Sequence, residues 1–258
     1  MIRIGDKVID QLSFPDGTLN IKIPEVDNLL VSWHYQNDSE LFTLICLRKH
    51  FEKFPMALYM PYCPHARMDR VKSPEDCFTL KYFCEVINDL DFSEVYIEDP
   101  HSNVAPALLK NCIVVQPQAH LDNVIEQLDN EDLVMCYPDE GAMKRYSDMV
   151  NKPYAFGIKK RNWEDGKILG LDLMNAEVVK DKDVLIVDDI CSRGGTFIHT
   201  AKALKEAGAN KVYLYVTHCE RTIFTGEIFD EDSNIEKVFT TNSIFPANST
   251  SEKIVIVD

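Results

Sequence analysis

Two adjacent carboxylates followed by a run of small residues are the feature of this sequence best suited to chemistry. The apolar run Val184–Val187 predicts a buried strand, which leads directly into Asp188 and Asp189. A turn of small residues follows, and helical spacing begins near Thr196. A strand, two acids, a tight turn and a helix, in that order, can aim backbone N–H groups and a helix N-terminus at a phosphate group.

The residues of this turn could make different kinds of contact with a ligand. Gly194 and Gly195 would let the backbone approach closely, and the hydroxyl groups nearby could donate hydrogen bonds. The two aspartates could accept hydrogen bonds from a vicinal diol or hold Mg²⁺ through water. A left-handed turn with a threonine helix cap and two solvated acids is the alternative. We call residues 188–196 the phosphate cradle, and its candidate contacts are Asp188, Asp189, Cys191, Ser192, Arg193, Gly194, Gly195 and Thr196.

The phosphate cradle resembles a phosphoribosyl-phosphate loop that two families have in common. Its acid pair, turn and Gly-Thr are similar to those of type I phosphoribosyltransferases and of ribose-phosphate pyrophosphokinases, the PRPP synthetases. The pyrophosphokinase pattern usually has a third acid and a threonine four and five positions after the first aspartate. Ser192 and Arg193 stand at those positions here, so the loop alone leaves both families open.

The first half of the chain favours the pyrophosphokinases, because phosphoribosyltransferases do not account for residues 1–115. Five further segments resemble pyrophosphokinase motifs and occur in the family's order, although Thr18 stands where the family has a glutamate. They are Ser13–Glu25, Asn37-Asp38, Pro61–Arg70, Ile97–His101 and Pro138–Arg145. The resemblance covers roughly residues 13–258.

The resemblance implies sites for ATP and for Mg²⁺. The candidate ATP-binding residues are Phe14, Asp16, Arg67, Asp69 and His101, of which Phe14 and Asp16 would serve a neighbouring subunit. The candidate Mg²⁺ ligands are His101, Asp99 and Asp139, and Asp139 would also touch the sugar. Magnesium prefers oxygen ligands, so the aspartates and water would supply most of its shell. A surface ion pair for Arg67 and a turn position for His101 are the alternatives.

Lys159 and Arg161 are the candidate catalytic residues by the same resemblance. They follow the predicted strand Ala155–Ile158 and precede a polar loop at 162–167. Their cations would reach the transferring phosphoryl group, and a solvated loop tip is the alternative. Because residues 159–161 form the densest basic cluster in an acidic chain, they favour an anionic ligand at this place.

These residues need a scaffold, and apolar strand-like runs alternate with amphipathic helical segments along the whole chain. This alternation predicts an α/β fold with parallel sheets and helices on both faces. With the resemblance, it predicts two phosphoribosyltransferase-like domains, each a mainly parallel sheet flanked by helices. We place an ATP-side domain at residues 1–117 and a ribose-5-phosphate-binding domain at 118–258, with the polar segment Gln116–His120 at the boundary.

Composition limits the function classes that remain. The chain has 27 Lys and Arg against 42 Asp and Glu, a net charge of −15, so nucleic acid is not an expected partner. Its apolar runs are strand-length and its start lacks a signal-peptide layout, which predicts no membrane association and a cytoplasmic location, in a host if the chain is viral. The eight cysteines are scattered singly, as expected for reduced packing residues.

The expected activity is ribose-phosphate diphosphokinase, which transfers the β,γ-diphosphoryl group of ATP to the anomeric hydroxyl of ribose 5-phosphate. The products are 5-phosphoribosyl 1-diphosphate (PRPP) and AMP. A homo-oligomer, at least a dimer, is expected because the adenine contacts would come from a neighbouring chain. Two alternatives remain: a type I phosphoribosyltransferase that uses PRPP, and a regulatory subunit of a PRPP synthetase that has lost catalysis.

Overall fold

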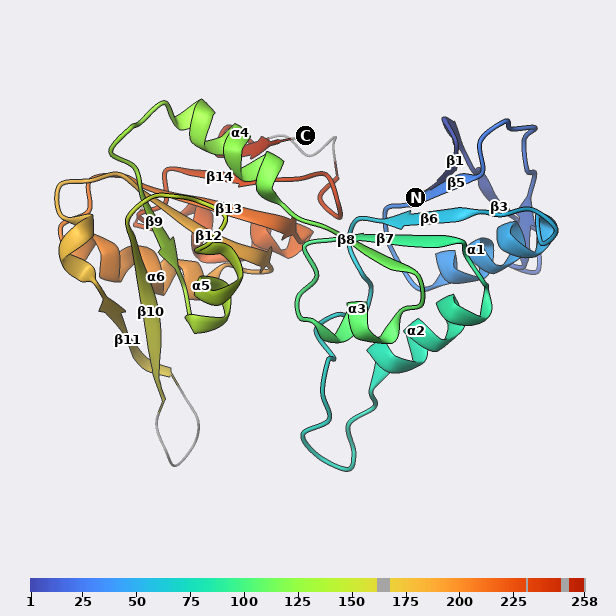
Figure 1. Cartoon of the computed structure of the whole chain (residues 1–258), viewed down its shortest axis with the longest axis horizontal. Helices are drawn as coiled ribbons and strands as arrows, with labels where there is room; N and C mark the ends of the chain where they lie inside the picture. The colour runs from blue at the N-terminus through green and yellow to red at the C-terminus, as the bar shows by residue number, and fades with distance from the viewer. Residues whose placement is uncertain (162–167, 231, 247–250, 258) are drawn as a thin grey trace. The chain divides into compact units, whose positions relative to one another are not determined.

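A mainly parallel sheet forms the centre of each of two units, Met1–Gln116 and Pro117–Asp258 (Figure 1). The computed structural model describes residues 1–161, 168–230, 232–246 and 251–257. In both units helices pack against the sheet, so the predicted α/β class with two mainly parallel, helix-flanked sheets is confirmed. Within the described ranges, no helix combines the length and the apolar content needed to cross a membrane.

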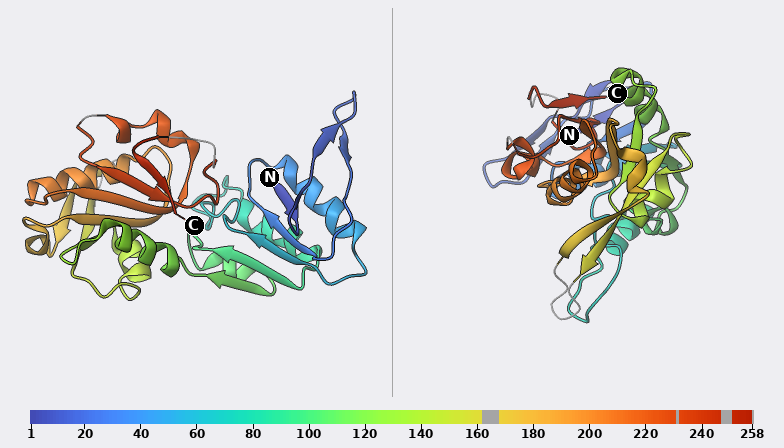
Figure 2. Two further views of the ribbon diagram at one scale, coloured as in Figure 1. Left: turned by 90° about the horizontal axis from the view of Figure 1, so that it is seen from above. Right: turned by 90° about the vertical axis from the view of Figure 1, so that its left-hand side faces the viewer.

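The sheet of unit 2 has the strand order β11-β10-β9-β12-β13-β14-β15. All neighbouring strands are parallel except the hairpin pair β10–β11, which extends beyond the rest of the sheet (Figure 2). The strands are β9 (Val134–Tyr137), β10 (Tyr154–Arg161), β11 (Ile168–Met174), β12 (Val184–Cys191), β13 (Val212–Cys219), β14 (Lys237–Thr240) and β15 (Ile254–Ile256). The helices are α4 (Gln118–Leu128), α5 (Glu140–Tyr146), α6 (Gly195–Glu206) and the 3₁₀ turns η1 (Ala176–Val179), η2 (Arg221–Thr225) and η3 (Glu227–Phe229).

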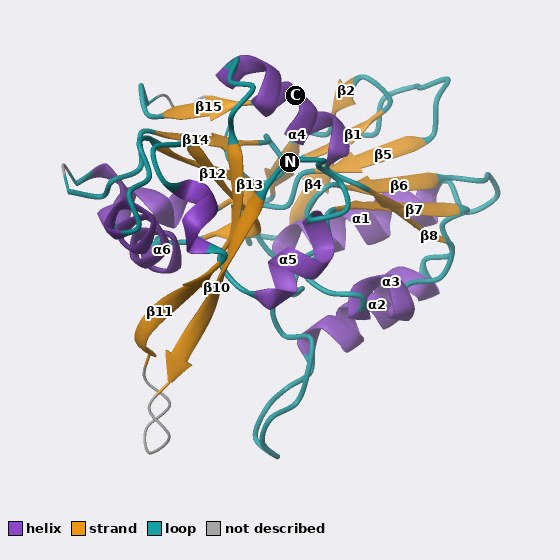
Figure 3. Cartoon of the chain, turned by 60° about the vertical axis from the view of Figure 1, so that its left-hand side comes forward, coloured by secondary structure: helices purple, strands orange, loops and turns teal. Residues whose placement is uncertain are grey.

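Helices cover both faces of this sheet, which is why its central strands contain continuous apolar runs such as Val184–Val187 of β12. Phe197 and Leu204 of α6 pack on one face in a cluster that includes Ile186. Tyr146 of α5 packs on the other face, in a cluster that includes Val187 and residues of α4. Figure 3 shows α6 and α5 on different sides of β12. Burial on both faces produces continuous apolar runs rather than alternation.

The sheet of unit 1 has the order β2-β1-β5-β6-β7-β8, in which β5 to β8 are parallel and β1 is antiparallel to both neighbours. The strands are β1 (Ile2–Ile4), β2 (Lys7–Val8), β5 (Leu30–Trp33), β6 (Ala57–Met60), β7 (Glu94–Glu98) and β8 (Cys112–Val115). The helices are α1 (Ser39–His50), α2 (Thr79–Asp89) and α3 (Val104–Leu108), and β3 (Gln11–Ser13) and β4 (Leu19–Ile21) form a separate hairpin.

Unit 1 buries one sheet face much more than the other. Along β5 and β6 burial alternates, so Val31 and Leu58 are buried while Ser32 and Tyr59 on the opposite face are half-buried. Helices α1, α2 and α3 all contribute to the core on the buried face (Figure 1). The expectation of helices on both faces therefore holds for unit 2, whereas the described helices of unit 1 share one face.

Several element limits differ from the sequence expectation. Strand β12 continues through both acids to Cys191, because its ladder with β13 extends to the pair Cys191 and Cys219. Helix α5 begins at Glu140, within the motif segment Pro138–Arg145. Tertiary pairing and capping decide these limits, and they override the weak strand and helix propensities of aspartate and glycine.

Candidate active site

The phosphate cradle lies at the carboxyl end of β12, where the turn Ser192–Gly194 leads into α6. Gly194 has a φ of 81° and is the N-cap, and its carbonyl oxygen accepts the N–H groups of Phe197 and Ile198 at 2.9 and 3.0 Å. No side chain of the described residues caps this helix, so the threonine cap of the alternative interpretation is not found. The first N–H groups of α6 are therefore suited to an anion.

The two glycines of the turn have different reasons to be glycine. A β-carbon at Gly194 would lie 2.2 Å from Cδ1 of Ile228, and the positive φ disfavours any L side chain. A β-carbon at Gly195 would meet nothing within 4 Å. Gly194 is thus required by the fold, whereas Gly195 faces open space that a ligand could fill.

The two acids of the cradle sit in different environments. Asp189 is only 3% exposed, and one of its oxygens lies 3.4 Å from Nη1 of Arg145 on α5. Asp188 is half-buried, and burial raises its pKa well above the usual range, with the charges of Asp189 and Asp139 adding to the effect. The alternative of two solvated acids is therefore wrong. Asp189 is buried and ion-paired, whereas the carboxyl group of Asp188 holds its proton more tightly than a solvated one.

Asp139 follows β9 and caps helix α5. Its Oδ1 accepts the backbone N–H groups of Gly141 and Ala142 at 3.0 and 3.1 Å. The negative charge of Asp139 contributes to the raised pKa of Asp188, so the structure brings Asp139 close to the acid pair. The cap fixes this carboxylate at the carboxyl edge of the sheet, where open α/β sheets bind ligands.

The rest of the cradle is held by the segment after β13. The Oγ atoms of Ser192 and Thr222 are 2.9 Å apart, and a β-carbon at Gly226 would lie 1.9 Å from the backbone oxygen of Arg193. Cys191 is buried, and a hydrogen bond with Cys219 together with burial raises the pKa of its thiol. Cys191 therefore supports the loop from below, while Ser192, Arg193 and Thr196 lie at least partly at the surface.

Lys159 and Arg161 lie within β10 rather than in a loop after it. Their backbones pair with Leu171 and Ile168 of β11. The strand extends past the predicted end at Ile158 because the antiparallel partner supplies its hydrogen bonds. The side chains of both residues, and the predicted loop at 162–167, lie outside the described residues.

In unit 1, Phe14 and Asp16 lie at the turn of the β3–β4 hairpin. Phe14 is 51% exposed, and Oδ1 of Asp16 accepts the backbone N–H and the hydroxyl of Thr18 at 3.0 and 2.7 Å. These bonds lower the pKa of Asp16. Thr18, which replaces the family's glutamate, therefore fixes the Asp16 carboxylate within the turn.

The segment with Arg67 and Asp69 meets the segment with His101. Asp69 is buried and accepts two hydrogen bonds from Arg70, at 2.7 and 3.1 Å. These bonds, together with Ser102 and the nearby charge of His101, lower the pKa of Asp69. Asp69 thus pairs with Arg70, and Arg67 is exposed.

Asp99 has a left-handed backbone with a φ of 39° and is 1% exposed, directly after β7. Strained positions of this kind cluster at functional sites. No group of three or more His, Cys, Asp or Glu among the described residues is arranged to hold a metal ion. Mg²⁺ usually takes one or two carboxylates together with substrate phosphates and water, so the acids near the sheet edges fit that role without such a group.

Sequence reasoning missed the residues that brace the cradle. Arg145 belongs to a motif that the sequence displays, but its pairing with Asp189 depends on how α5 packs against β12. Thr222, Gly226 and Ile228 are about 30 positions from the loop that they contact and have no local signal.

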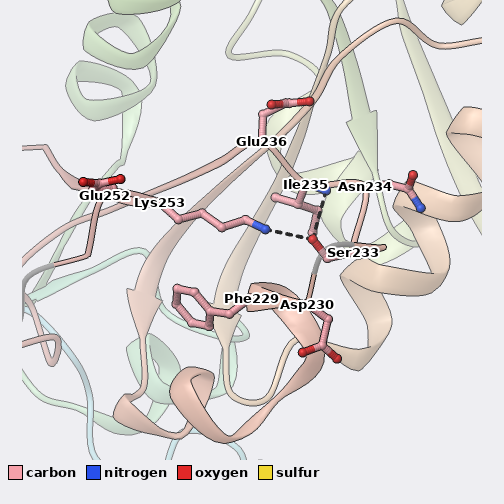
Figure 4. Close-up of a pocket in the computed structure, with 8 residues that line it drawn as sticks. All are labelled: Phe229, Asp230, Ser233, Asn234, Ile235, Glu236, Glu252 and Lys253. Carbon is pink, nitrogen blue, oxygen red and sulfur yellow. Dashed lines mark hydrogen bonds between the residues drawn. The ribbon is translucent and has the colours of Figure 1, made fainter.

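A pocket of about 380 Å³ lies elsewhere in unit 2, at the start of β14 (Figure 4). Lys253 crosses it and donates a hydrogen bond to Ser233 at 2.8 Å. The lining includes Asp230, Glu236 and Glu252 and none of the predicted site residues.

Comparison with known proteins shows which class of protein this chain belongs to. The family model of the phosphoribosyl transferase domain matches residues 118–248, more than half of the chain. The chain is thus a phosphoribosyltransferase-domain protein by the fold and the loop of unit 2. The chain is 27% identical over 246 residues to the ribose-phosphate pyrophosphokinase of Thermococcus kodakarensis, covering 90% of this chain and 84% of that protein. It is 26% identical over 272 residues to that of Sulfurisphaera tokodaii, covering 100% and 89%.

The fold agrees over both units. The crystal structure of phosphoribosylpyrophosphate synthetase from Mycobacterium smegmatis superposes with a TM-score of 0.76 at 17% identity, covering 97% of this chain and 85% of that one. This likeness concerns the fold alone. The near full-length sequence similarity shows that the chain belongs to the ribose-phosphate pyrophosphokinase family.

Proposed function

We propose that this protein is a ribose-phosphate diphosphokinase, which converts ATP and ribose 5-phosphate to AMP and PRPP. The observation that carries the proposal is the start of α6, which no described side chain caps, after Gly194 and behind the acids of β12. It offers N–H donors for the 5-phosphate and carboxylate acceptors for the ribose hydroxyls within one loop.

The acid pair divides its work in this proposal. Asp189 is paired with Arg145 and holds the loop, and half-buried Asp188 accepts hydrogen bonds from the ribose diol. Oδ1 of Asp188 already accepts the backbone N–H of Asp189 at 2.9 Å, and a ligand hydroxyl would add a further donor, so sugar binding favours the ionised form of Asp188. The acid pair and the start of α6 would then hold the two ends of the sugar phosphate within unit 2.

Unit 1 supplies the nucleotide contacts. Arg67 is exposed and its planar guanidinium suits a phosphate group. Phe14 and Asp16 would contact adenine of a neighbouring chain, and the exposed apolar side chains of Leu12 and Phe14 on the hairpin are consistent with a homo-oligomer of at least two chains. The reaction uses soluble metabolites, for which we propose a cytoplasmic location.

Charge spreads over the phosphoryl oxygens during the transfer, so catalysis depends on positioning and on cations. Lys159 and Arg161 would stabilise this charge. When bound, Mg²⁺ neutralises phosphate charge. Its candidate ligands, beside substrate oxygens and water, are Asp99 and His101 in unit 1 and Asp139 in unit 2. His101 lies close to Asp69, which supports a common ATP-side site for these loops.

A product analysis separates the proposal from its rivals. The purified protein is incubated with ATP, Mg²⁺ and ribose 5-phosphate, and nucleotides are resolved by chromatography. Formation of AMP together with PRPP supports the proposal. Release of diphosphate from PRPP and a nucleobase would instead indicate a phosphoribosyltransferase, and the absence of both reactions would indicate a subunit without catalysis.

A further inference from the structure

The turn of the phosphate cradle carries a serine where the family pattern usually has a third acid, and this serine is linked to a carboxylate on the neighbouring strand end. Ser192 Oγ is 2.9 Å from Thr222 Oγ1, and Thr222 Oγ1 donates to Oε2 of Glu220 at 3.1 Å. Glu220 directly follows β13, and its backbone N–H donates to the oxygen of Cys191 at 2.8 Å. The carboxylate is therefore anchored beside the start of the turn.

The direction of this hydrogen-bond chain follows from counting protons. A hydroxyl group has one proton to donate, and an ionised carboxylate can only accept. Because Thr222 gives its proton to Glu220, the proton between the two hydroxyl groups must come from Ser192. Ser192 is left with oxygen lone pairs only, so it can accept a hydrogen bond from a ligand but has no proton to donate.

We propose that Glu220, acting through Thr222, makes Ser192 an acceptor for a ribose hydroxyl group and so replaces the third acid of the family pattern. An ionised aspartate at position 192 would also accept hydrogen bonds and donate none. The hydrogen-bond chain of Ser192, Thr222 and Glu220 therefore gives the serine the same hydrogen-bonding property as the acid that it replaces. Glu220 and Thr222 are positioning residues, and the ligand class is a sugar phosphate with a vicinal diol. The inference rests on the proposed function, since it concerns the same ribose 5-phosphate site.

The surrounding contacts keep this chain in place. Gly226 packs on the backbone oxygen of Arg193, and Ile228 packs on Gly194, so the segment that follows Thr222 is fixed against the turn. The backbone bond from Glu220 to Cys191 fixes the segment that precedes it. Thr225, in the same 3₁₀ turn, donates its hydroxyl proton to the backbone oxygen of Thr222 at 2.7 Å and not to the cradle. It therefore provides a matched control.

Calorimetric titration of the full chain with sugar phosphates tests the inference. Thr222→Val removes the acceptor for the Ser192 proton and keeps the side-chain shape. We expect it to weaken ribose 5-phosphate binding about two- to tenfold, the range for one neutral hydrogen bond, and to leave orthophosphate binding unchanged. The titration is repeated with 2-deoxyribose 5-phosphate and 3-deoxyribose 5-phosphate. One of these analogues lacks the hydroxyl that donates a hydrogen bond to Ser192, and it should bind the wild type and Thr222→Val with equal affinity. Thr222→Ser should restore the wild-type affinities, and Thr225→Val should retain them.

A double-mutant cycle gives the second measurement. In a Ser192→Ala background, Thr222→Val should have no further effect on ribose 5-phosphate binding. Equal losses for orthophosphate and for every sugar, or an unchanged affinity for ribose 5-phosphate, would overturn the inference while the proposed function stands. A wild-type protein that binds neither sugar nor orthophosphate would overturn the proposed function as well.

Discussion

The phosphate cradle of unit 2 and the β3–β4 hairpin of unit 1 carry their binding residues in contrasting ways. In the cradle, Asp189 of strand β12 is paired with Arg145 of helix α5, and Ser192 is bonded to Thr222, 30 positions away. In the hairpin, Asp16 accepts its two hydrogen bonds from Thr18, two positions away. The cradle is part of the tertiary core, whereas the hairpin turn is organised locally.

This difference teaches which binding residues also carry stability. Side chains that are locked by packing and by distant partners hold a ligand site rigid, and their loss costs folding energy as well. Residues of a locally bonded, exposed turn can change with little effect on the fold. The account therefore expects the ribose half of the reaction to be preorganised and the adenine contact to depend on the hairpin sequence.

The largest effect is expected for Lys159→Ala, with Arg67→Ala as its counterpart in unit 1. An ammonium group is needed most where charge develops in the transition state, so Lys159→Ala should lower kcat on the order of 10²–10³-fold. Arg67→Ala should instead mainly raise the KM for ATP. Steady-state kinetics with both substrates measures this, and an unchanged kcat for Lys159→Ala would remove its catalytic assignment.

Gly194→Ala and Gly195→Ala form a matched pair one position apart. Gly194 has a positive φ and no room for a β-carbon beside Ile228, so Gly194→Ala should lower the free energy of unfolding by about 1–3 kcal/mol. Gly195→Ala adds a methyl group in open space at the first turn of α6 and should be neutral or stabilising by up to about 1 kcal/mol. Urea denaturation measures both, and equal losses would contradict the packing account of the turn.

Arg145→Met tests whether Asp189 depends on its partner. It leaves a nearly buried carboxylate without its guanidinium, which should cost about 1–3 kcal/mol. The adjacent Lys144 forms an exposed pair with Glu140 at 3.7 Å, and Lys144→Met should cost about 0.5 kcal/mol or less. If thermal denaturation gave the two variants the same stability, the ion pair between Arg145 and Asp189 would not contribute to the stability of the fold.

Asp188→Asn should change how stability depends on pH. Because burial and neighbouring acids raise the pKa of Asp188, the folded protein holds that proton more tightly than the unfolded chain does. The stabilisation is present at low pH and is lost as pH rises through the folded-state pKa. In a chelating buffer, the melting temperature of Asp188→Asn should therefore rise relative to wild type between acidic and neutral pH. A relative fall over that range would contradict the raised pKa.

The smallest effect on stability is expected for Asp16→Ala in the hairpin. Its bonds are local and exposed, so the melting temperature should stay that of the wild type. Affinity for ATP should fall, as measured by calorimetry on the assembled protein. A clear drop in melting temperature would show that the hairpin is part of the folded core and would weaken the contrast with the cradle.

The sequence predicted the fold class and the strand, turn and helix of the phosphate cradle, because both depend on local patterns. The apolar runs and the Gly-Gly turn of the cradle are visible within about ten residues. The continuation of β12 through Asp188 and Asp189 and the one-sided helices of unit 1 depend on strand pairing and packing that no local window contains. The roles of Arg145 and Thr222 depend on contacts between distant segments, which a single sequence does not display.

The most direct test of the central claim follows the phosphorus atoms of ATP by ³¹P NMR, with the protein, Mg²⁺ and ribose 5-phosphate present. Transfer of the β,γ-diphosphoryl group breaks the bond between the β-phosphorus and the oxygen that bridges it to the α-phosphorus, and this oxygen leaves with AMP. A bond forms between the β-phosphorus and the anomeric oxygen, which loses its proton. We predict that the three ATP resonances disappear together and that AMP and PRPP appear in equal amounts, only when ribose 5-phosphate is added. Formation of ADP with a ribose bisphosphate, or ATP that stays unchanged over hours, would contradict the account.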